Sequence, residues 1–361
     1  MKRIVLVGGG HAHLHCLREL QEDYFHNIEW ILVSSSRYQY YSGMFSGYTE
    51  GLYTEEDIRV DLEKLCLSAN VTFKEMTVMS IDPKSQKLLG DQGDILDYDI
   101  LSLDIGSLNT NPTIDGLDQH NLKIKPNHLF SEKIEQLRSS EKPVIIGGGA
   151  AGVEMALSLQ AWHKKQHTGV HVTLIHSSPV MEETGEKASK RLAQIVEESG
   201  IRSIQQRVSS VTGTHVETKA GDEVLYDEVL YLGGPSAPRL LKSSKLPVDE
   251  NGYLLLNSHL QTELYPMIFG AGDCISLESH QDTPRNGVNA VRQGPVLYHN
   301  LVSQAKGEAL QTYTPQRRFL AILSTGGKRG FLVYEQLVVS GRWAWHLKNW
   351  IDKSFIQKNS V

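Results

Sequence analysis

The 361-residue chain has few cysteines and no excess of positive charge. Its three cysteines, Cys16, Cys66 and Cys274, are scattered, which excludes a disulfide framework and fits a reducing cytosol. With 36 basic and 42 acidic residues, the formal net charge is -6, so composition indicates no nucleic-acid partner. Cys16 and Cys66 read as buried small hydrophobes, and with no close cysteine pair we do not expect disulfide chemistry.

The chain also lacks a long uninterrupted hydrophobic run. Its most apolar stretch, residues 144–162, contains a glycine cluster and Glu154, which favours a strand and helix over a membrane-spanning segment. No signal peptide is predicted because the first strand begins at once, so we expect a cytoplasmic location. His11 and His15 stand one helical turn apart, but no acid or cysteine cluster accompanies them, and no metal site is expected.

Two glycine-rich turns of the same kind are the most informative feature present. Each follows a short apolar run and leads into a helical pattern, a context in which backbone N–H groups hold a pyrophosphate. The first has His13 where a third glycine is usual, whereas the second is complete: Gly8-Gly9-Gly10-His11-Ala12-His13 and Gly147-Gly148-Gly149-Ala150-Ala151-Gly152. Two such turns predict two dinucleotides, one of them a flavin, brought together for electron transfer.

The order of apolar and helical segments predicts two weakly repeated units. The first has strands at 3–7, 28–33, 71–81 and 98–105, a helix at 12–21 and a long polar-aromatic loop at 34–44. The second, near 141–234, has a helix to 166, a strand at 171–176, a helix at 185–199 and a closing strand at 229–232. The chain then returns to the first unit, with a helix at 287–306, a hairpin of 319–324 with 331–338, and a helix at 343–358.

Several motifs together resemble a known family. Residues 8–13, 147–154 and 270–273 resemble the flavoproteins with two dinucleotide-binding domains, such as type II NADH dehydrogenases, sulfide:quinone oxidoreductases and pyridine-nucleotide–disulfide reductases. Residues 8–13, 41–44, 103–107, 125–126 and 290–295 look most like the NADH-dehydrogenase-like flavoproteins associated with selenide, water dikinase.

This resemblance covers nearly the whole chain and implies its fold and domains. It implies an α/β protein with two Rossmann-like domains of the three-layer ββα type and a small C-terminal α+β segment. The expected domains are an FAD-binding domain in two parts, an NAD(P)H-binding domain between them, and a C-terminal hairpin with an amphipathic helix: residues 1–115 and 245–312, 116–244, and 313–361.

The resemblance also implies the cofactors, FAD with NAD(P)H as co-substrate, and their binding residues. FAD would contact Gly8, Gly9, Gly10, His11, Ala12, Ser34, Arg37, Val78, Gly106, Asp273 and Gln293. NAD(P)H would contact Gly147, Gly149, Gly152, Glu154, His176 and Gly234. The catalytic residues stay unknown, and the candidates near the flavin are Met44, Asp104, Lys125 and Gln293.

Two departures concern the adenosine ribose sites. The acid usual at the end of the second strand is replaced by Ser34 in the first unit and His176 in the second. Without an acid NADPH is not repelled, yet no arginine pair attracts it, so the choice between NADH and NADPH stays open.

The expected reaction is hydride transfer from NAD(P)H to FAD, followed by electron delivery to a quinone or similar acceptor. A flavoenzyme acting on a sulfur or selenium compound, and a flavin-binding regulatory protein with a degenerate nicotinamide site, are the alternatives. In the helix at 343–358, a stripe of Trp343, Leu347, Trp350 and Phe355 with nearby Lys348, Lys353 and Lys358 suits contact with the inner face of a membrane. Packing on its own domain, or on a second subunit in a homodimer, is the other interpretation.

Overall fold

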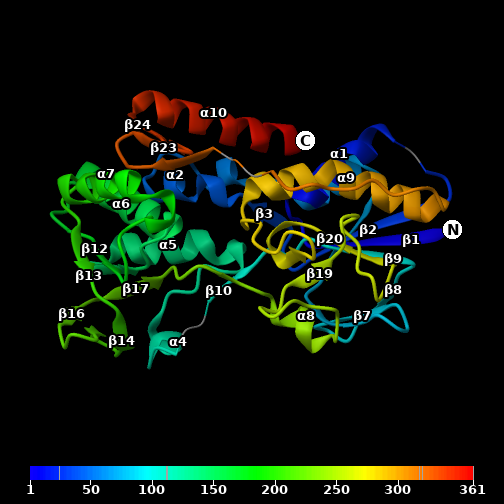
Figure 1. Ribbon diagram of the computed structural model, residues 1–361, viewed down its shortest axis with the longest axis horizontal. Coiled ribbons are helices and arrows are strands. Elements are labelled where there is room, and N and C mark those ends of the chain that lie inside the picture. Colours follow the sequence, from blue (N-terminus) through cyan, green and yellow to red (C-terminus); the bar gives the residue numbers. More distant parts are fainter. Residues whose placement is uncertain (24, 111–112, 317, 319, 361) are drawn as a thin grey trace.

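A parallel sheet of five strands organises the first unit (Figure 1). The structure is a computed structural model that describes residues 1–23, 25–110, 113–316, 318 and 320–360. The strand order is β20-β9-β1-β2-β5, and the chain leaves this sheet after β9 and returns with β20. Its elements are β1 (Lys2–Val7), α1 (His11–Glu22), β2 (Ile28–Ser34), β5 (Thr72–Glu75), β9 (Ile100–Leu103) and β20 (Ile268–Gly270).

The second unit repeats this arrangement in four parallel strands. Their order is β13-β12-β11-β17, which matches β5-β2-β1-β9 of the first sheet. The elements are β11 (Pro143–Ile146), α6 (Ala150–Gln166), β12 (Thr173–His176), α7 (Glu186–Glu198), β13 (Arg202–Gln205) and β17 (Glu228–Tyr231). Strand β1 contains a buried apolar run at residues 4–7 and all four residues of β11 are buried, as expected for parallel strands covered on both faces.

Each unit adds a three-stranded antiparallel sheet, which lies in sequence between β5 and β9 in the first unit and between β13 and β17 in the second. The antiparallel strands are β6 (Val78–Asp82), β7 (Lys87–Gly90) and β8 (Ile95–Asp97), and β14 (Val208–Val211), β15 (His215–Thr218) and β16 (Glu223–Leu225). In Figure 1 the helices α1 and α6 lie above the parallel sheets and the antiparallel strands lie below them. The expected α/β fold with two three-layer Rossmann-like units is confirmed; the domain boundaries themselves stay predictions.

Two short segments cross between the units, and α9 (Gly287–Lys306) packs on α1. The crossing strands β10 (Leu108–Asn109) and β18 (Pro235–Ser236) pair antiparallel. The remaining elements around the units are β3 (Tyr38–Tyr40), η1 (Ser42–Met44), α2 (Phe45–Thr49), η2 (Glu56–Ile58), β4 (Arg59–Asp61), α3 (Leu62–Ser68), α4 (Leu117–His120), η3 (Asn127–Leu129), α5 (Phe130–Ser139), η4 (Glu182–Thr184), α8 (Arg239–Ser243), β19 (Leu254–Leu256), η5 (Gly272–Cys274) and β21 (Ile275–Leu277).

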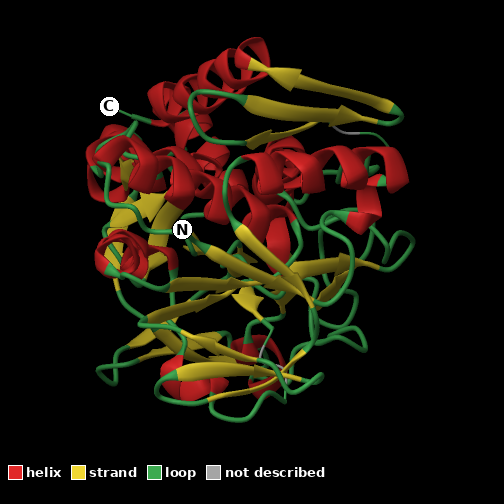
Figure 2. Cartoon of the chain, turned by 90° about the vertical axis from the view of Figure 1, so that its left-hand side faces the viewer, coloured by secondary structure: helices red, strands yellow, loops and turns green. Residues whose placement is uncertain are grey.

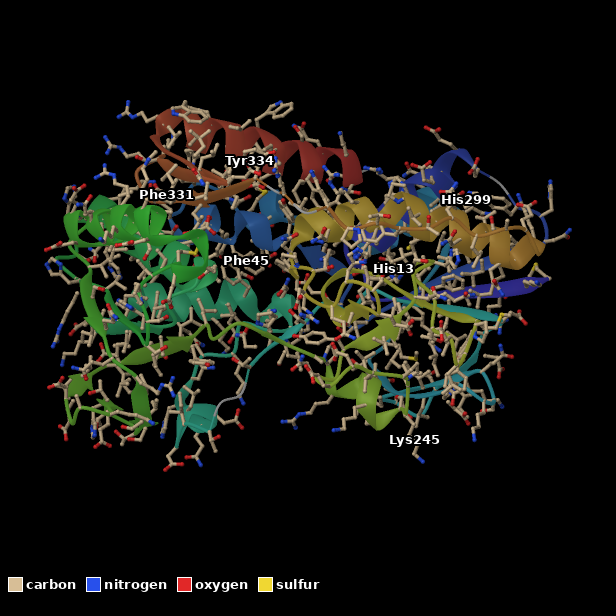
Figure 3. All side chains as sticks on the ribbon, in the orientation of Figure 1. His13, Phe45, Lys245, His299, Phe331 and Tyr334 are labelled. Carbon is tan, nitrogen blue, oxygen red and sulfur yellow. The ribbon has the colours of Figure 1, made fainter. Side chains whose placement is uncertain are left out.

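The C-terminal unit lies across the helical side of both halves (Figures 1 and 2). It consists of β22 (Ala321–Ser324), β23 (Gly330–Tyr334), β24 (Leu337–Gly341) and α10 (Arg342–Asn359). Helix α10 contacts β22 and β23 of its own sheet and also α1 of the first unit. Phe331 of β23 and Phe45 of α2, both labelled in Figure 3, belong to one buried apolar cluster. The unit is therefore packed into the molecule.

Three expected elements differ from the structure. The strand expected at 71–81 is two strands, because β5 ends the parallel sheet at Glu75 and β6 begins the antiparallel one. The hairpin expected from 319–324 and 331–338 is a three-stranded sheet, because the chain turns at Glu335 (φ 53°). Phe319 lies outside the described residues.

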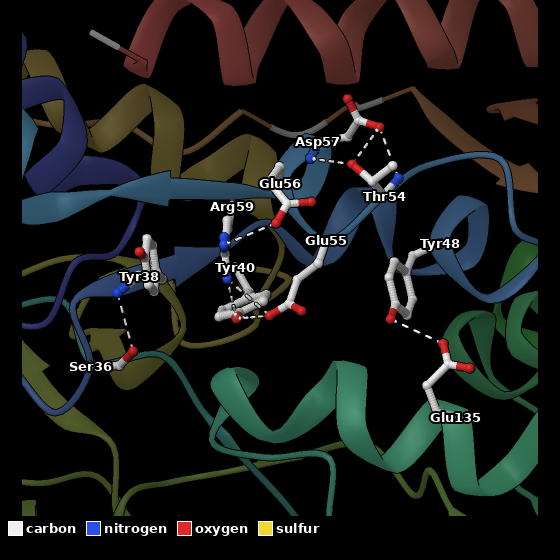
Figure 4. Close-up of polar contacts among 10 residues, drawn as sticks. All are labelled: Ser36, Tyr38, Tyr40, Tyr48, Thr54, Glu55, Glu56, Asp57, Arg59 and Glu135. Atoms are coloured by element: carbon white, nitrogen blue, oxygen red, sulfur yellow. Dashed lines mark hydrogen bonds and ion pairs between the residues drawn. The ribbon is translucent and has the colours of Figure 1, made fainter.

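The expected loop at 34–44 is also ordered into elements. Strand β3 pairs with β4, and η1 and α2 follow. Figure 4 shows the side-chain contacts of this region. Tyr40 Oη donates a hydrogen bond to the Glu55 carboxylate, which also forms an ion pair with Arg59 at 3.0 Å. Tyr48 Oη donates to Glu135 of α5 at 3.1 Å, which ties the segment to the second unit. Among the described residues, no helix is long and apolar enough to cross a bilayer.

Candidate active site

The first glycine turn is tight because backbone and a carboxylate approach it closely. Gly8 has a positive φ of 91°, and a Cβ atom there would collide with the Asp104 carbonyl group. A Cβ atom at Gly10 would collide with the Asp104 carboxylate. Helix α1 starts at His11 without a side-chain cap, and among the described residues nothing accepts from the N–H groups of Gly9, Gly10 and His11. These free donors at a helix N-terminus suit a pyrophosphate.

Asp104 and His13 hold this turn from beneath. Asp104 Oδ2 accepts from the N–H of Ala12 at 2.9 Å and of His13 at 3.2 Å. Burial raises the pKa of Asp104 to about 7, although these two N–H donors favour its charged form. The His13 ring joins the Gly8 carbonyl (2.6 Å) to Ser102 Oγ (2.8 Å), and burial lowers its pKa to about 4. His13 therefore fills the place of the third glycine by bridging β1 to β9.

The candidates Gln293, Asp273 and Lys125 lie around the start of η5. Gln293 Oε1 accepts from the N–H of Gly272 at 2.7 Å, which fixes α9 to this turn. Burial raises the pKa of Asp273, and the nearby charges of Lys125 and Arg285 lower it in part. Lys125 Nζ donates to the Ser107 carbonyl oxygen at 2.8 Å, and burial lowers its pKa.

The second glycine turn keeps open space in front of it. Gly147 has φ 141°, and Gly152 packs so closely on the Gly147 carbonyl oxygen that no Cβ fits. A Cβ atom at Gly149 would meet no heavy atom within 4 Å. Helix α6 begins at Ala150 without a side-chain cap, so its first N–H groups are available to an anion.

Other expected binding residues are spread over the two units. Val78 begins β6, Ser34 ends β2, and Gly106 and Gly234 occupy left-handed turns with nothing within 4 Å of a Cβ position. Arg37 is committed to ion pairs with Asp61 at 2.7 Å and Glu63 at 2.9 Å.

His176 ends β12 as expected, but its ring is buried and fully partnered. Nδ1 lies 2.7 Å from the Ser178 carbonyl oxygen and Nε2 lies 2.8 Å from Ser203 Oγ. The ring thus already has a hydrogen-bond partner at each nitrogen.

The first, second and C-terminal units meet at Glu154, which lies five residues after Gly149, the N-cap of α6. Glu154 Oε1 accepts from Ser46 Oγ at 3.0 Å and from the N–H of Ser324 at 2.7 Å, and burial raises its pKa. Lys348 Nζ lies 3.9 Å from the same oxygen and donates to the Gly43 carbonyl oxygen at 2.6 Å. Residues of α2, β22 and α10 therefore contact one carboxylate of α6, and η1 joins them through Lys348.

Helix α10 extends this cluster to the first glycine turn. Lys348 Nζ pairs with Asp352 Oδ2 at 2.9 Å, and Tyr41 Oη donates to Asp352 Oδ1 at 3.0 Å. The ring of Phe355 stacks on Tyr41 at 4.4 Å and lies 4.9 Å from His11. Met44, one residue past Gly43, is buried in the adjoining core. Elements expected to bind FAD and NAD(P)H separately are therefore joined through α10.

Sequence reasoning was wrong about two residues of α10 and missed a third. Lys348 does not present its charge to a lipid surface, because it is largely buried and paired with Asp352 and Glu154. Phe355 is not on an exposed stripe, because it packs on Tyr41 and His11. Asp352 was missed; its place at i+4 from Lys348 could have indicated an ion pair on the same face.

The three cysteines are all free and buried. Burial raises the pKa of Cys66 to about 12 and that of Cys16 and Cys274 further still. A thiolate nucleophile is therefore disfavoured at each position.

The residues present fit an FAD group at the first turn. The turn offers three free N–H groups, and His11 Nε2 is buried with no partner in the described structure. The buried, raised-pKa carboxyl of Asp273 stands near the N-terminal end of α9, whose first turn carries no acidic residue. A flavin bound there would supply the hydride-accepting and electron-transferring chemistry.

Comparisons with known proteins agree with this arrangement. Residues 2–294 match the pyridine nucleotide-disulphide oxidoreductase family. Ferroptosis suppressor protein 1 of Homo sapiens is 27% identical, with 86% of this chain and 83% of that protein covered. The type II NADH:quinone oxidoreductase of Staphylococcus epidermidis (strain ATCC 12228 / FDA PCI 1200) is 23% identical, with 99% and 96% covered.

A solved structure shows the same fold. NDH2 from Plasmodium falciparum in complex with NADH superposes with a TM-score of 0.81 at 12% identity, covering 99% of this chain and 97% of that one. Because the family match spans most of the chain and includes both glycine turns, the chain belongs to the pyridine nucleotide-disulphide oxidoreductase family, as a flavoprotein NAD(P)H oxidoreductase.

Proposed function

We propose that the chain transfers hydride from NAD(P)H at the second glycine turn to FAD at the first, and then delivers electrons to a quinone. The convergence on Glu154 carries this proposal. Glu154 belongs to the helix that starts at the second turn, and through Lys348, Asp352, Tyr41 and Phe355 it connects to the first turn. Positioning of two bound dinucleotides against each other accounts for most of the catalysis of hydride transfer.

The same cluster suits an acceptor that takes up protons with its electrons. Burial alone would lower the pKa of Lys348, but the carboxylates of Glu154 and Asp352 raise it above its usual value. Burial raises the pKa of Glu154 and of Asp352. Each group thus binds a proton more tightly than it would in water, and Tyr41 Oη donates a hydrogen bond to Asp352. A quinone needs two protons per electron pair, and these groups would hold protons close to it.

The quinone itself is proposed from similarity and from this proton-holding cluster. One relative is named a type II NADH:quinone oxidoreductase. A sulfur or selenium substrate is less favoured because the three thiols are buried and protonated. A regulatory protein with a degenerate second site is less favoured because the second turn keeps its glycines and free N–H groups. The finer relationship to flavoproteins found with selenide, water dikinase rests on the sequence motifs alone.

Peripheral contact with the inner face of a membrane is a second part of the proposal. On α10, Trp343 is 50% and Trp350 67% exposed, and Lys353 stands exposed on the same face. Exposed tryptophans beside a lysine are typical of a helix at a membrane surface. This face replaces the stripe expected from the sequence, and a homodimer that covers it is the competing outcome.

Stopped-flow mixing of the FAD-loaded protein with NADH or NADPH, followed by a quinone, tests the function. We expect loss of the flavin absorbance with at least one nicotinamide and its recovery with the quinone. A flavin that neither nicotinamide reduces would contradict the dehydrogenase, and a reduced flavin that quinone does not reoxidise would contradict the acceptor alone.

A further inference from the structure

A basic cleft lies between the second unit and the C-terminal sheet. Helices α6 and α7 form one wall, and the β22–β23 turn with the start of α10 forms the other. The cleft has a volume of about 660 Å³ and opens to solvent. Its basic side chains are Lys164, Arg191, Arg329 and Arg342.

The charge of this cleft contrasts with that of the whole protein. The chain carries a formal net charge of -6, yet the cleft has these four basic residues and a single acid, Glu198. Glu198 pairs with Arg191 at 3.9 Å. Among the described residues, no carboxylate lies within ion-pair distance of Lys164, Arg329 or Arg342. Three unneutralised cations in a concave wall concentrate a positive potential that favours an anion.

The wall that carries Arg329 is held rigidly. Thr325 N–H donates to the Arg329 carbonyl oxygen at 2.9 Å, and Gly327 N–H donates to Glu50 of the α2 end at 2.9 Å. Gly326 packs against α6 so closely that a Cβ there would lie 2.7 Å from Ala161 Cβ. The cleft is therefore preformed, which lowers the entropy cost of binding.

We infer that this cleft binds a phosphate-bearing anion. The guanidinium groups of Arg191, Arg329 and Arg342 present planar forks that match phosphate oxygens, and Lys164 adds a point charge. The phosphate has two candidate sources. A lipid headgroup would reach the cleft because the exposed Trp343 directly follows Arg342, and a soluble phosphorylated molecule would enter from solvent. The inference goes beyond the proposed function, because the cleft residues touch neither glycine turn.

The test compares two double variants of the FAD-loaded protein that lose the same charge. Arg329→Gln with Arg342→Gln removes two cleft cations. Arg202→Gln with Arg207→Gln is the matched control, since both arginines are exposed on the second unit, line no part of the cleft and form no ion pair with a described residue. Calorimetric titration with inorganic pyrophosphate, and sedimentation with vesicles of phosphatidylcholine with or without phosphatidylglycerol, give the two readouts.

We expect the cleft variant to lose at least about tenfold in affinity for one of the two probes, because two charge-assisted contacts are removed. The control should keep wild-type affinity, and both should keep FAD and its reduction by the nicotinamide. Loss confined to pyrophosphate identifies a soluble ligand, and loss confined to phosphatidylglycerol vesicles identifies a lipid headgroup. Equal losses in both double variants, or no loss in the cleft variant for either probe, would overturn the inference.

Discussion

A single buried carboxylate, that of Asp104, shapes the first glycine turn. It accepts two N–H groups of α1 and leaves no room for a side chain at Gly10. The family resemblance indicated only that Asp104 is a candidate near the flavin. The structure places it directly beneath the turn, fully enclosed between Gly10 and Gly272.

The titration of Asp104 should appear in the pH dependence of stability. Burial raises its pKa to about 7 in the folded chain, well above the usual value for an aspartate, so the folded state binds the proton more tightly. Its contribution to stability is therefore greatest below pH 4 and falls as pH rises through 7, by at most about 1.4 kcal/mol per pH unit.

Asp104→Asn keeps an oxygen for the two N–H donors and removes this titration. In urea unfolding of the FAD-free protein across this pH range, we expect the variant to gain stability relative to wild type as pH rises. Other buried acids, such as Glu154, are present in both proteins and cancel in the difference. A constant difference across the range would show that Asp104 does not titrate as described.

Asp273 offers a test of the FAD site itself. If its carboxylate accepts hydrogen bonds from FAD, Asp273→Ala should weaken FAD binding by about one to two decades, since such charged bonds contribute roughly 1.5–3 kcal/mol. Equilibrium dialysis of FAD measures the change. Asp282→Ala, an exposed acid in the following loop, is the control. Unchanged FAD affinity in Asp273→Ala would place the flavin elsewhere.

Among the elements, α10 has two faces with different roles. The inner face carries Lys348, Asp352 and Phe355 into the active-site cluster, and the outer face exposes Trp343 and Trp350. Periodicity showed that a helix would form but could not distinguish these faces, since both contain aromatic and lysine residues. The partners that distinguish them, Tyr41 and Glu154, are distant in sequence.

The inner face should contribute strongly to stability. Lys348→Ala leaves the buried carboxylate of Asp352 and the partly buried one of Glu154 without their cation. Breaking a buried pair in this way costs about 3–5 kcal/mol. We expect a lower midpoint of urea unfolding and faster proteolysis of α10. Lys358→Ala, which removes an exposed lysine from the same helix, should change neither. Equal effects of the two substitutions would mean that the Lys348 pairs do not hold α10.

The outer face should determine membrane contact. Trp343→Ser with Trp350→Ser removes two large exposed side chains, each worth roughly 1.5–3 kcal/mol when fully buried in an apolar phase. We expect weaker sedimentation with phosphatidylglycerol-containing vesicles and unchanged flavin reduction by the nicotinamide. A shift from dimer to monomer in light scattering, with unchanged vesicle binding, would instead assign this face to a second copy. The double substitution is preferred to removal of residues 342–361, because that truncation would also remove Lys348 and Asp352 of the inner face.

At the scale of the whole molecule, the repeated units were predictable and their meeting point was not. Glycine turns and apolar runs are local signals, and they predicted both parallel sheets and the return of the chain to the first one. The cluster around Glu154 depends on contacts between residues up to 311 positions apart, such as Tyr41 with Asp352. No local pattern encodes such contacts, so Tyr41, Glu154, Lys348 and Phe355 were named from separate motifs, without the contacts that join them.

Glu154 tests whether the three parts of the molecule work together in one reaction. Its carboxylate is fixed by Ser46 of the first unit, by Ser324 of the C-terminal unit and by Lys348 of α10. Glu154→Gln keeps an oxygen for Ser46 and Ser324 but no longer holds a transferable proton. If this group supplies a proton to the acceptor, reoxidation of the flavin by quinone should slow by about 10²-fold or more, while FAD binding is retained.

Glu50→Gln is the matched control, because Glu50 is a buried acid that contacts Gly327 instead of the cluster. Stopped-flow measurement of flavin reduction and of flavin reoxidation separates the outcomes. Equal slowing of reoxidation in both variants would reduce Glu154 to a packing role. Slowing confined to Glu154→Gln would support proton delivery from the point where the first unit, the second unit and the C-terminal unit meet.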